Sequence, residues 1–188
     1  MPWVTLIFFL AAGAYPSSTY AEDLPHFSED GYRISYYRSA TPNHIDFGTL
    51  VTTDTLVSKL ASSPDLIMID VQPVTWRHGI FIMDTPRRSL PKSIWLPNVG
   101  WGEAEEHWQR YFKDHLGRLT GQDYNKEIVL FCTADCWMSW NAVRRAAEWG
   151  YNRLYWYAEG TDGWYEAGLP LMEIAPEPLG VEALLYTE

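Results

Sequence analysis

The chain has 188 residues, a length that suits one domain with appendages and is too short for two domains and a linker. Its composition, 47% hydrophobic and 20% charged, is that of a globular protein and excludes wholesale disorder and a polytopic membrane protein. The formal net charge of -10 disfavours anionic partners, so we expect no binding to nucleic acid. Only 2 Cys occur beside 10 Trp and 12 Tyr, and the cysteines are four positions apart.

The first 21 residues contain no charged side chain, and the apolar block between Trp3 and Ala14 is too short to span a bilayer. Thr19 and Ala21 suit the small-residue positions before a cleavage site, although no Lys or Arg precedes the apolar block. We therefore expect a signal peptide over 1–21, with an uncleaved anchor as the alternative. Cleavage would leave a protein of the periplasm, an oxidising compartment, with no stable membrane insertion.

Residues 22–49 carry the aromatic segment GYRISYYRSATP among glycines and prolines. Ile34, Tyr36 and Arg38 alternate along this segment and can share one face of an extended chain. The pattern predicts an N-terminal extended arm that packs on the main domain.

The segment LIMIDV at 66–71 is an apolar run of strand length that ends with the acid Asp70. Further runs without polar alternation lie at 93–97, 127–132 and 153–157, the last of which we expect to be the final strand. Such runs are typical of strands that are buried on both faces of a sheet.

Helices are predicted from Thr52 onward, over 101–116, and from Cys136 to a stop at Gly150, because apolar residues recur there every three or four positions. Strands alternating with helices predict an α/β fold with a mostly parallel central sheet, flanked by helices on both faces. Three segments lack such a pattern, and we expect a long loop at 72–93, a turn at 159–164 and an irregular acidic tail at 173–188.

Cys132 ends the predicted strand at 127–132, where ligands bind in parallel sheets. The amino terminus of the following helix would stabilise a thiolate there and lower its pKa, although Asp135 opposes this. The alternative is that Cys132 is a small buried apolar residue.

The spacing of Cys132 and Cys136 allows a disulfide without requiring one. So short a ring would stabilise the fold by only about 2 kcal/mol, so a chemical role is favoured over a structural staple. The 5 His residues are scattered without ligand spacing to the pair, so zinc binding is disfavoured and no metal ligands are assigned. Copper binding by the two cysteines is left as an alternative.

The stretch from EIVLFC to GYNRLYWYAEGTDGWYEAGLPL resembles the second half of a rhodanese-like (sulfurtransferase) domain. LIMIDV and SLPKSIWLP resemble earlier parts of that domain, so the resemblance covers 50–172. The segment FCTADCWMSWNAVRRAAEWGY, together with the arm, resembles the exported CXXCW-motif proteins associated with pyrroloquinoline quinone (PQQ)-dependent catabolism. The resemblance implies a rhodanese-like domain over 50–172, between the arm at 22–49 and the tail at 173–188.

By that resemblance, Cys132 takes the position of the persulfide-carrying nucleophile, and the active-site loop continues through Thr133, Ala134, Asp135, Cys136, Trp137, Met138 and Ser139. An acid and bulky side chains stand where the family usually has glycine and a basic residue to hold an oxyanion, so ordinary thiosulfate sulfurtransferase activity is disfavoured. Three residues separate the cysteines, so a thioredoxin-type CxxC mechanism does not carry over.

The first functional hypothesis is thiol redox or sulfur-carrier chemistry linked to PQQ-dependent alcohol oxidation. Cys132 would attack as a thiolate, Cys136 would resolve the intermediate as a disulfide, Trp137 would cover the site, and Asp135 would tune it or accept a proton.

The second hypothesis is a non-catalytic module that binds PQQ, a PQQ-dependent dehydrogenase or its cytochrome c. Flat aromatic rings could stack on a flat ligand, although we expect most of the aromatic residues to be core. PQQ is a polyanion and would need cations. The candidate ligand-binding residues are Trp76, Arg77, His78, Arg87 and Arg88.

Overall fold

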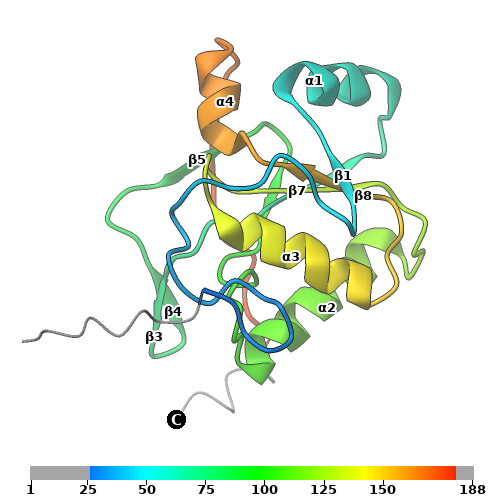
Figure 1. Cartoon of the computed structure of the whole chain (residues 1–188). Coiled ribbons are helices and arrows are strands. Elements are labelled where there is room, and N and C mark those ends of the chain that lie inside the picture. The colour runs from blue at the N-terminus through cyan, green and yellow to red at the C-terminus, as the bar shows by residue number, and fades with distance from the viewer. Residues whose placement is uncertain (1–25, 181–188) are drawn as a thin grey trace, which may run out of the picture.

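The computed structural model describes residues 26–180, so the predicted signal peptide and the last eight residues of the tail lie outside the described part. A five-stranded parallel sheet in the order β1-β8-β7-β2-β6 forms the centre of the molecule (Figure 1). The strands predicted at 66–71, 93–97, 127–132 and 153–157 are all confirmed. In chain order the sheet consists of β1 (Thr49–Leu50), β2 (Ile67–Asp70), β6 (Ile94–Trp95), β7 (Ile128–Phe131) and β8 (Leu154–Tyr157).

Helices cover both faces of the sheet, as the sequence predicts. Helices α1 (Thr53–Ser62) and α4 (Gly160–Glu166) lie on one face, and α2 (Glu106–Thr120) and α3 (Trp137–Glu148) lie on the other (Figure 1). Successive residues of β7 belong to two separate apolar clusters. Val129 lies in the cluster that includes residues of α1 and α4, and Leu130 lies in the cluster that includes residues of α2 and α3. Both faces of each central strand are therefore apolar, which explains the missing polar alternation.

The boundaries of the helices follow from local capping. Thr52 begins α1, because its hydroxyl accepts a hydrogen bond from the Thr55 backbone N–H at 3.3 Å. The helix predicted over 101–116 instead spans Glu106–Thr120, so its predicted start was wrong. Residues 101–105 form turns, and Gly102 lies so close to the Arg33 carbonyl that a side chain would collide with it. The helix ends at Gly121, whose φ of 64° suits glycine.

Three segments that lack a pattern in the sequence form regular structure. The expected loop at 72–93 contains a hairpin of β3 (Thr75–Arg77) and β4 (Ile80–Ile82), followed by β5 (Arg87–Ser89). Strand β5 pairs with β9 (Met172–Ile174) at the start of the expected tail, so β8 is not the last strand. The expected turn at 159–164 is the start of α4. Short strands with exposed side chains and a helix with two glycines carry little periodic signal.

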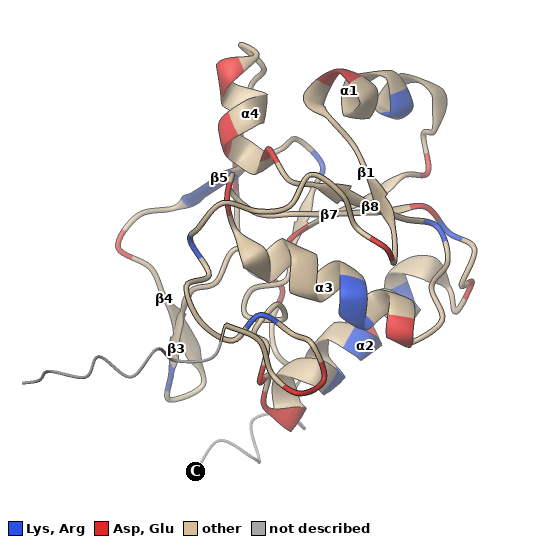
Figure 2. Ribbon diagram, in the orientation of Figure 1, with Lys and Arg blue, Asp and Glu red and all other residues tan. Residues whose placement is uncertain are grey.

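The arm packs along α3, within the described part of the chain. Asn141, fully buried on α3, accepts from the Arg33 backbone N–H at 2.9 Å and donates to the Arg33 carbonyl at 2.8 Å. The first turns of α3 carry no charged residue, and charges gather at its carboxyl end (Figure 2). Among residues 26–180, no helix is long and apolar enough to cross a membrane.

Candidate functional site

The candidate site lies at the carboxyl edge of the sheet, where β2 and β7 end side by side. Cys132 follows β7, and its side chain is fully buried. Gln72 follows β2 two residues after Asp70, and its Oε1 accepts a hydrogen bond from the Cys132 Sγ at 3.0 Å. Because parallel strands end at the same edge, chain segments sixty residues apart meet at this sulfur.

Both cysteines are free thiols, and their environments differ. Burial raises the pKa of Cys132, and its hydrogen bond to Cys136 and the charge of Asp70 add to this effect. The pKa of Cys136 is lowered, first by the hydrogen bond that the Cys132 thiol donates and then by backbone N–H groups at the start of α3. Of the two thiols, Cys136 is therefore the one whose ionisation the surroundings favour.

This distribution reverses the expectation that the helix would lower the pKa of Cys132. The physical reason is position: Cys136 occupies the N-cap of α3, whereas Cys132 ends the strand four residues earlier. The unpaired N–H groups of a helix act over its first turn only, so the residue at the cap benefits most.

The arm pairs with the active-site loop along its length. The Trp137 backbone N–H donates to the Tyr37 carbonyl at 2.9 Å, and the Ser39 N–H donates to the Asp135 carbonyl at 3.1 Å. The Asp135 carboxylate accepts from the Thr41 N–H at 3.3 Å. The carboxylate of Asp135, which was expected to oppose a thiolate, therefore binds the arm.

Helix α4 holds the loop from the other side. Asp162 accepts a hydrogen bond from the Ala134 backbone N–H at 3.1 Å, and the Thr161 N–H donates to the Cys132 carbonyl at 2.9 Å. Gly160 has a φ of 56°, and a side chain there would collide with the same carbonyl oxygen. This close approach requires glycine and positions the carboxyl end of β7.

The remaining loop residues support the backbone. Trp137 was expected to cover the thiols, but its Nε1 donates to Ser39 of the arm at 3.1 Å and its ring lies 4.8 Å from the Arg33 guanidinium. Met138 is buried, and Ser139 donates to the Cys136 carbonyl at 3.0 Å. These three side chains fix the start of α3 beside the thiolate.

A cleft of about 670 Å³ opens at the same edge, between the 72–88 segment and α4. Gln72 and Thr133 line it, so the Gln72 side chain separates the cleft from the buried Cys132 sulfur. Of the predicted ligand-binding residues, Arg87 and Arg88 line this cleft.

The other predicted ligand-binding residues lie elsewhere. Trp76 packs against Phe81 and Trp108, with ring centroids 4.6 and 5.9 Å apart, and therefore contributes to the core. Arg77 and His78 are exposed on the β3–β4 hairpin and do not line the cleft.

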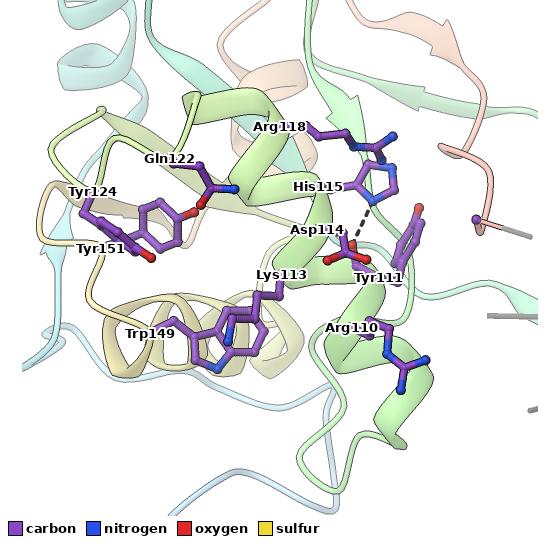
Figure 3. Close-up of a pocket in the computed structure, with 11 residues that line it drawn as sticks. Arg110, Tyr111, Lys113, Asp114, His115, Arg118, Gln122, Tyr124, Trp149 and Tyr151 are labelled. Carbon is purple, nitrogen blue, oxygen red and sulfur yellow. Dashed lines mark hydrogen bonds between the residues drawn. The ribbon is translucent and has the colours of Figure 1, made fainter. Parts of the chain in front are cut away.

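A second pocket, of about 560 Å³, lies around α2, and no predicted site residue lines it (Figure 3). His115 is buried there, and its Nδ1 is hydrogen bonded to the Tyr111 carbonyl at 2.8 Å. Burial lowers the pKa of His115. Within residues 26–180, no group of three or more His, Cys, Asp or Glu side chains could hold a metal ion.

Sequence reasoning missed Gln72, Asp162 and the contact of Arg38 with the loop. Gln72 could have been found, because it follows Asp70 at the end of a predicted strand parallel to the one that carries Cys132. Asp162 and Arg38 carry no such signal, since their segments reach the loop only through tertiary packing.

Cys132 thus lies at the carboxyl edge of a parallel sheet that helices cover on both faces, between the following loop and the short helix α4 (Figure 1). The family model of the rhodanese-like domain matches residues 53–167, and the chain belongs to this family. The match begins at α1, so the arm lies outside it. No curated protein matches the chain.

Three solved structures are similar to this chain at low identity. A thiosulfate sulfurtransferase from Pseudomonas aeruginosa is 14% identical with a TM-score of 0.50, over 73% of this chain and 23% of that one. The polysulfide-sulfur transferase homodimer from Wolinella succinogenes is 18% identical with a TM-score of 0.43, over 69% and 81% of the two chains. A protein from Lactobacillus plantarum is 16% identical with a TM-score of 0.45, over 66% and 88%. Identities this low show the fold alone.

Proposed function

We propose that this rhodanese-like protein is a sulfur carrier or thiol redox protein that works through Cys132 and Cys136, without ordinary thiosulfate sulfurtransferase activity. The observation that supports this most is the pair of free thiols that lie next to each other, of which Cys136 has the lowered pKa. A buried apolar cysteine would need no such partner, and the pair is not bridged as a structural staple would be.

In the first step, the Cys132 sulfur attacks the outer sulfur of an anionic persulfide or polysulfide donor. The Cys132 proton passes to the Cys136 thiolate, the sulfur–sulfur bond of the donor breaks, and the rest of the donor leaves as a thiolate. Cys132 then carries a persulfide and Cys136 a thiol. Cys136 is suited to accept this proton because its pKa is lowered, and because the Cys132 S–H is released for it once the donor displaces Gln72.

In the second step, the persulfide has two fates. An acceptor thiolate can take the outer sulfur and release the Cys132 thiolate. Otherwise Cys136, once deprotonated, attacks the Cys132 Sγ, expels hydrosulfide and forms the Cys132–Cys136 disulfide. A thiol reductant then returns the pair to two thiols.

The donor would enter through the cleft and displace the Gln72 side chain from the Cys132 sulfur. Intact-mass spectrometry after incubation with inorganic polysulfide tests this. The wild-type protein should gain a sulfur atom, and Cys132→Ser should gain none. Cys136→Ser should hold the sulfur longer, because resolution to the disulfide is removed. Equal sulfur uptake by Cys132→Ser would refute the assignment.

We also propose that the protein is exported to the periplasm and serves PQQ-dependent alcohol oxidation, with a PQQ-dependent dehydrogenase or its cytochrome c as partner. The charge-free apolar segment at 1–21 and the resemblance of the loop and arm to the CXXCW-motif proteins support this. Cell fractionation should recover a shortened chain in the periplasmic fraction. A full-length chain in the cytoplasm would contradict the export proposal.

Direct binding of PQQ, without turnover, is a second candidate function because Arg87 and Arg88 line the cleft. Asp70 pairs with Arg87 at 2.8 Å, so an anionic ligand would depend chiefly on the exposed Arg88. Titration with PQQ should quench tryptophan fluorescence, and Arg88→Gln should weaken the effect. Absence of quenching at saturating PQQ would exclude this function.

A further inference from the structure

Arg38 brings a positive charge to the active-site loop from outside the family domain. Its guanidinium donates a hydrogen bond to the Thr133 Oγ1, and its backbone forms an isolated antiparallel bridge with Cys136. Thr133 also lies 3.9 Å from the Cys132 Sγ through its Oγ1. The Arg38 side chain is therefore next to both the sulfur pair and a residue that lines the cleft.

Two other cations near the site, Arg33 and Arg87, have partners that hold them in place, and the exposed Arg88 donates to the Leu171 carbonyl at 3.2 Å. Arg33 is buried, donates to the Ser35 carbonyl at 2.7 Å and stacks on Trp137. Arg87 is paired with the buried Asp70 at 2.8 Å. Arg38 differs from Arg33 and Arg87 because its side chain is exposed, and from Arg88 because it is bonded to Thr133 beside the thiols. A guanidinium carries five N–H groups in a planar fork, so the bond to Thr133 leaves donors for an anion.

The charges around the pair make such a cation necessary for an anionic donor. The carboxylates of Asp135 and Asp162 lie on or beside the loop, and ionisation of Cys136 adds a further negative charge there. A second anion that approaches these groups is repelled unless a positive charge offsets them. The positive charge of Arg38 also helps to lower the pKa of Cys136, so it acts on the resident anion already.

We propose that Arg38 of the arm determines the specificity of the site for anionic sulfur compounds, by binding the incoming anion at Thr133 beside the thiol pair. The inference rests on the proposed sulfur chemistry for its natural substrate class, persulfide or polysulfide anions. The arm is thus part of the active site, and the matched family domain over 53–167 is incomplete without it.

The test compares two disulfide reagents that differ in charge, the dianion dithionitrobenzoate and the neutral dithiodipyridine. Inorganic polysulfide is tested beside them. Arg38→Gln should slow the reactions with dithionitrobenzoate and polysulfide about tenfold at low salt and leave the dithiodipyridine rate within about twofold. Arg38→Lys should restore part of the anion rate. The matched control is Arg153→Gln, which removes an exposed charge at the amino end of β8 and should change no rate.

Equal slowing of the anionic and neutral reagents by Arg38→Gln, or no slowing of either, would overturn the inference. The failure of the proposed function is a separate result: the wild-type protein would gain no sulfur from polysulfide while its Arg38-dependent preference for the anionic disulfide persisted. High salt should abolish that preference in the wild-type protein, because the interaction is between charges.

Discussion

At the scale of single residues, the two cysteines lie only four positions apart in the sequence, yet their pKa values are shifted in opposite directions. Cys132 is fully buried among apolar groups, which disfavours its charged form. Cys136 receives hydrogen bonds from Cys132 and from the first N–H groups of α3, which favour its charged form. Ionisation is therefore favoured at Cys136 and disfavoured at Cys132, so Cys136 is the better proton acceptor of the two.

Alkylation should follow this asymmetry. With iodoacetamide, peptide mapping should find the first label on Cys136, with a half-maximal rate at a pH below that of an ordinary cysteine, because its pKa is lowered. In Cys136→Ser, the label should move to Cys132 and require higher pH, because burial raises that pKa. First labelling of Cys132 at low pH would contradict the assignment of the thiolate.

At the scale of elements, α4 is joined to the edge of the sheet by close backbone contact and to α1 by the carboxylate of Glu159. Glu159, before α4, accepts from the Thr53 N–H at the start of α1 at 2.9 Å, so α1 and α4 are linked above the same sheet face. At the opposite edge, Glu127 joins α1 and β8 through Lys59 at 2.6 Å and Tyr155 at 2.8 Å. Both ends of the sheet thus depend on polar links between elements distant in sequence.

Gly160→Ala should destabilise the protein by about 3 kcal/mol, because the methyl group meets the Cys132 carbonyl and the residue has a positive φ. Gly168→Ala is the matched control: its φ is 74°, and a side chain there would meet nothing within 4 Å. The control should lose only about 1 kcal/mol, the cost of the backbone conformation. Urea unfolding measures both variants, and equal losses would disprove the collision.

Glu127 should make stability depend on acid pH. Hydrogen bonds from Lys59 and Tyr155 lower its pKa from 4.5 to about 2. Because the folded state binds the proton less well, this stability is present above pH 4.5 and is lost as the pH falls toward 2. Glu127→Gln should remove about 2 kcal/mol at neutral pH and flatten the unfolding free energy across that range. Glu166→Gln, an exposed change on α4, should leave the profile as it is in the wild-type protein.

At the scale of the whole molecule, the loop after Cys132 is packed between two segments, α4 and the arm. The loop is held by α4 on one side and by residues 37–41 on the other. The arm in turn is held by Asn141, which bonds both backbone groups of Arg33 and the Gly100 carbonyl. A displacement of the arm would therefore also disturb the loop.

Asn141→Ala should release the arm, since three buried hydrogen bonds are lost at a cost of about 2–3 kcal/mol. Limited proteolysis should cut the arm faster in this variant while α2 and α3 stay resistant. Asn152→Ala, which removes an exposed side chain bonded only to Asn125 among the described residues, should show the wild-type cleavage rate. An unchanged arm in Asn141→Ala would show that other contacts hold it.

The central part of the fold could be predicted from the sequence because its signals are local. Apolar runs such as 66–71 and 127–132 predict buried strands, and Thr52 predicts the start of α1. The β5–β9 pairing could not be predicted, because each strand is three residues long and its partner lies far along the chain. Helix α4 was missed because glycines at 160 and 163 are typical of turns.

The sequence by itself determined that Cys132 ends a buried strand, that Cys136 starts a helix and that the chain contains a rhodanese-like domain. Only the tertiary structure decided which of the two sulfurs has the lowered pKa, because that depends on burial and on the direction of backbone N–H groups. It also placed Gln72 against the Cys132 sulfur and Arg38 against Thr133. The periodicity of apolar residues indicates which side chains of a helix or strand face the core. Contacts between segments distant in sequence form only when the helices and strands pack together.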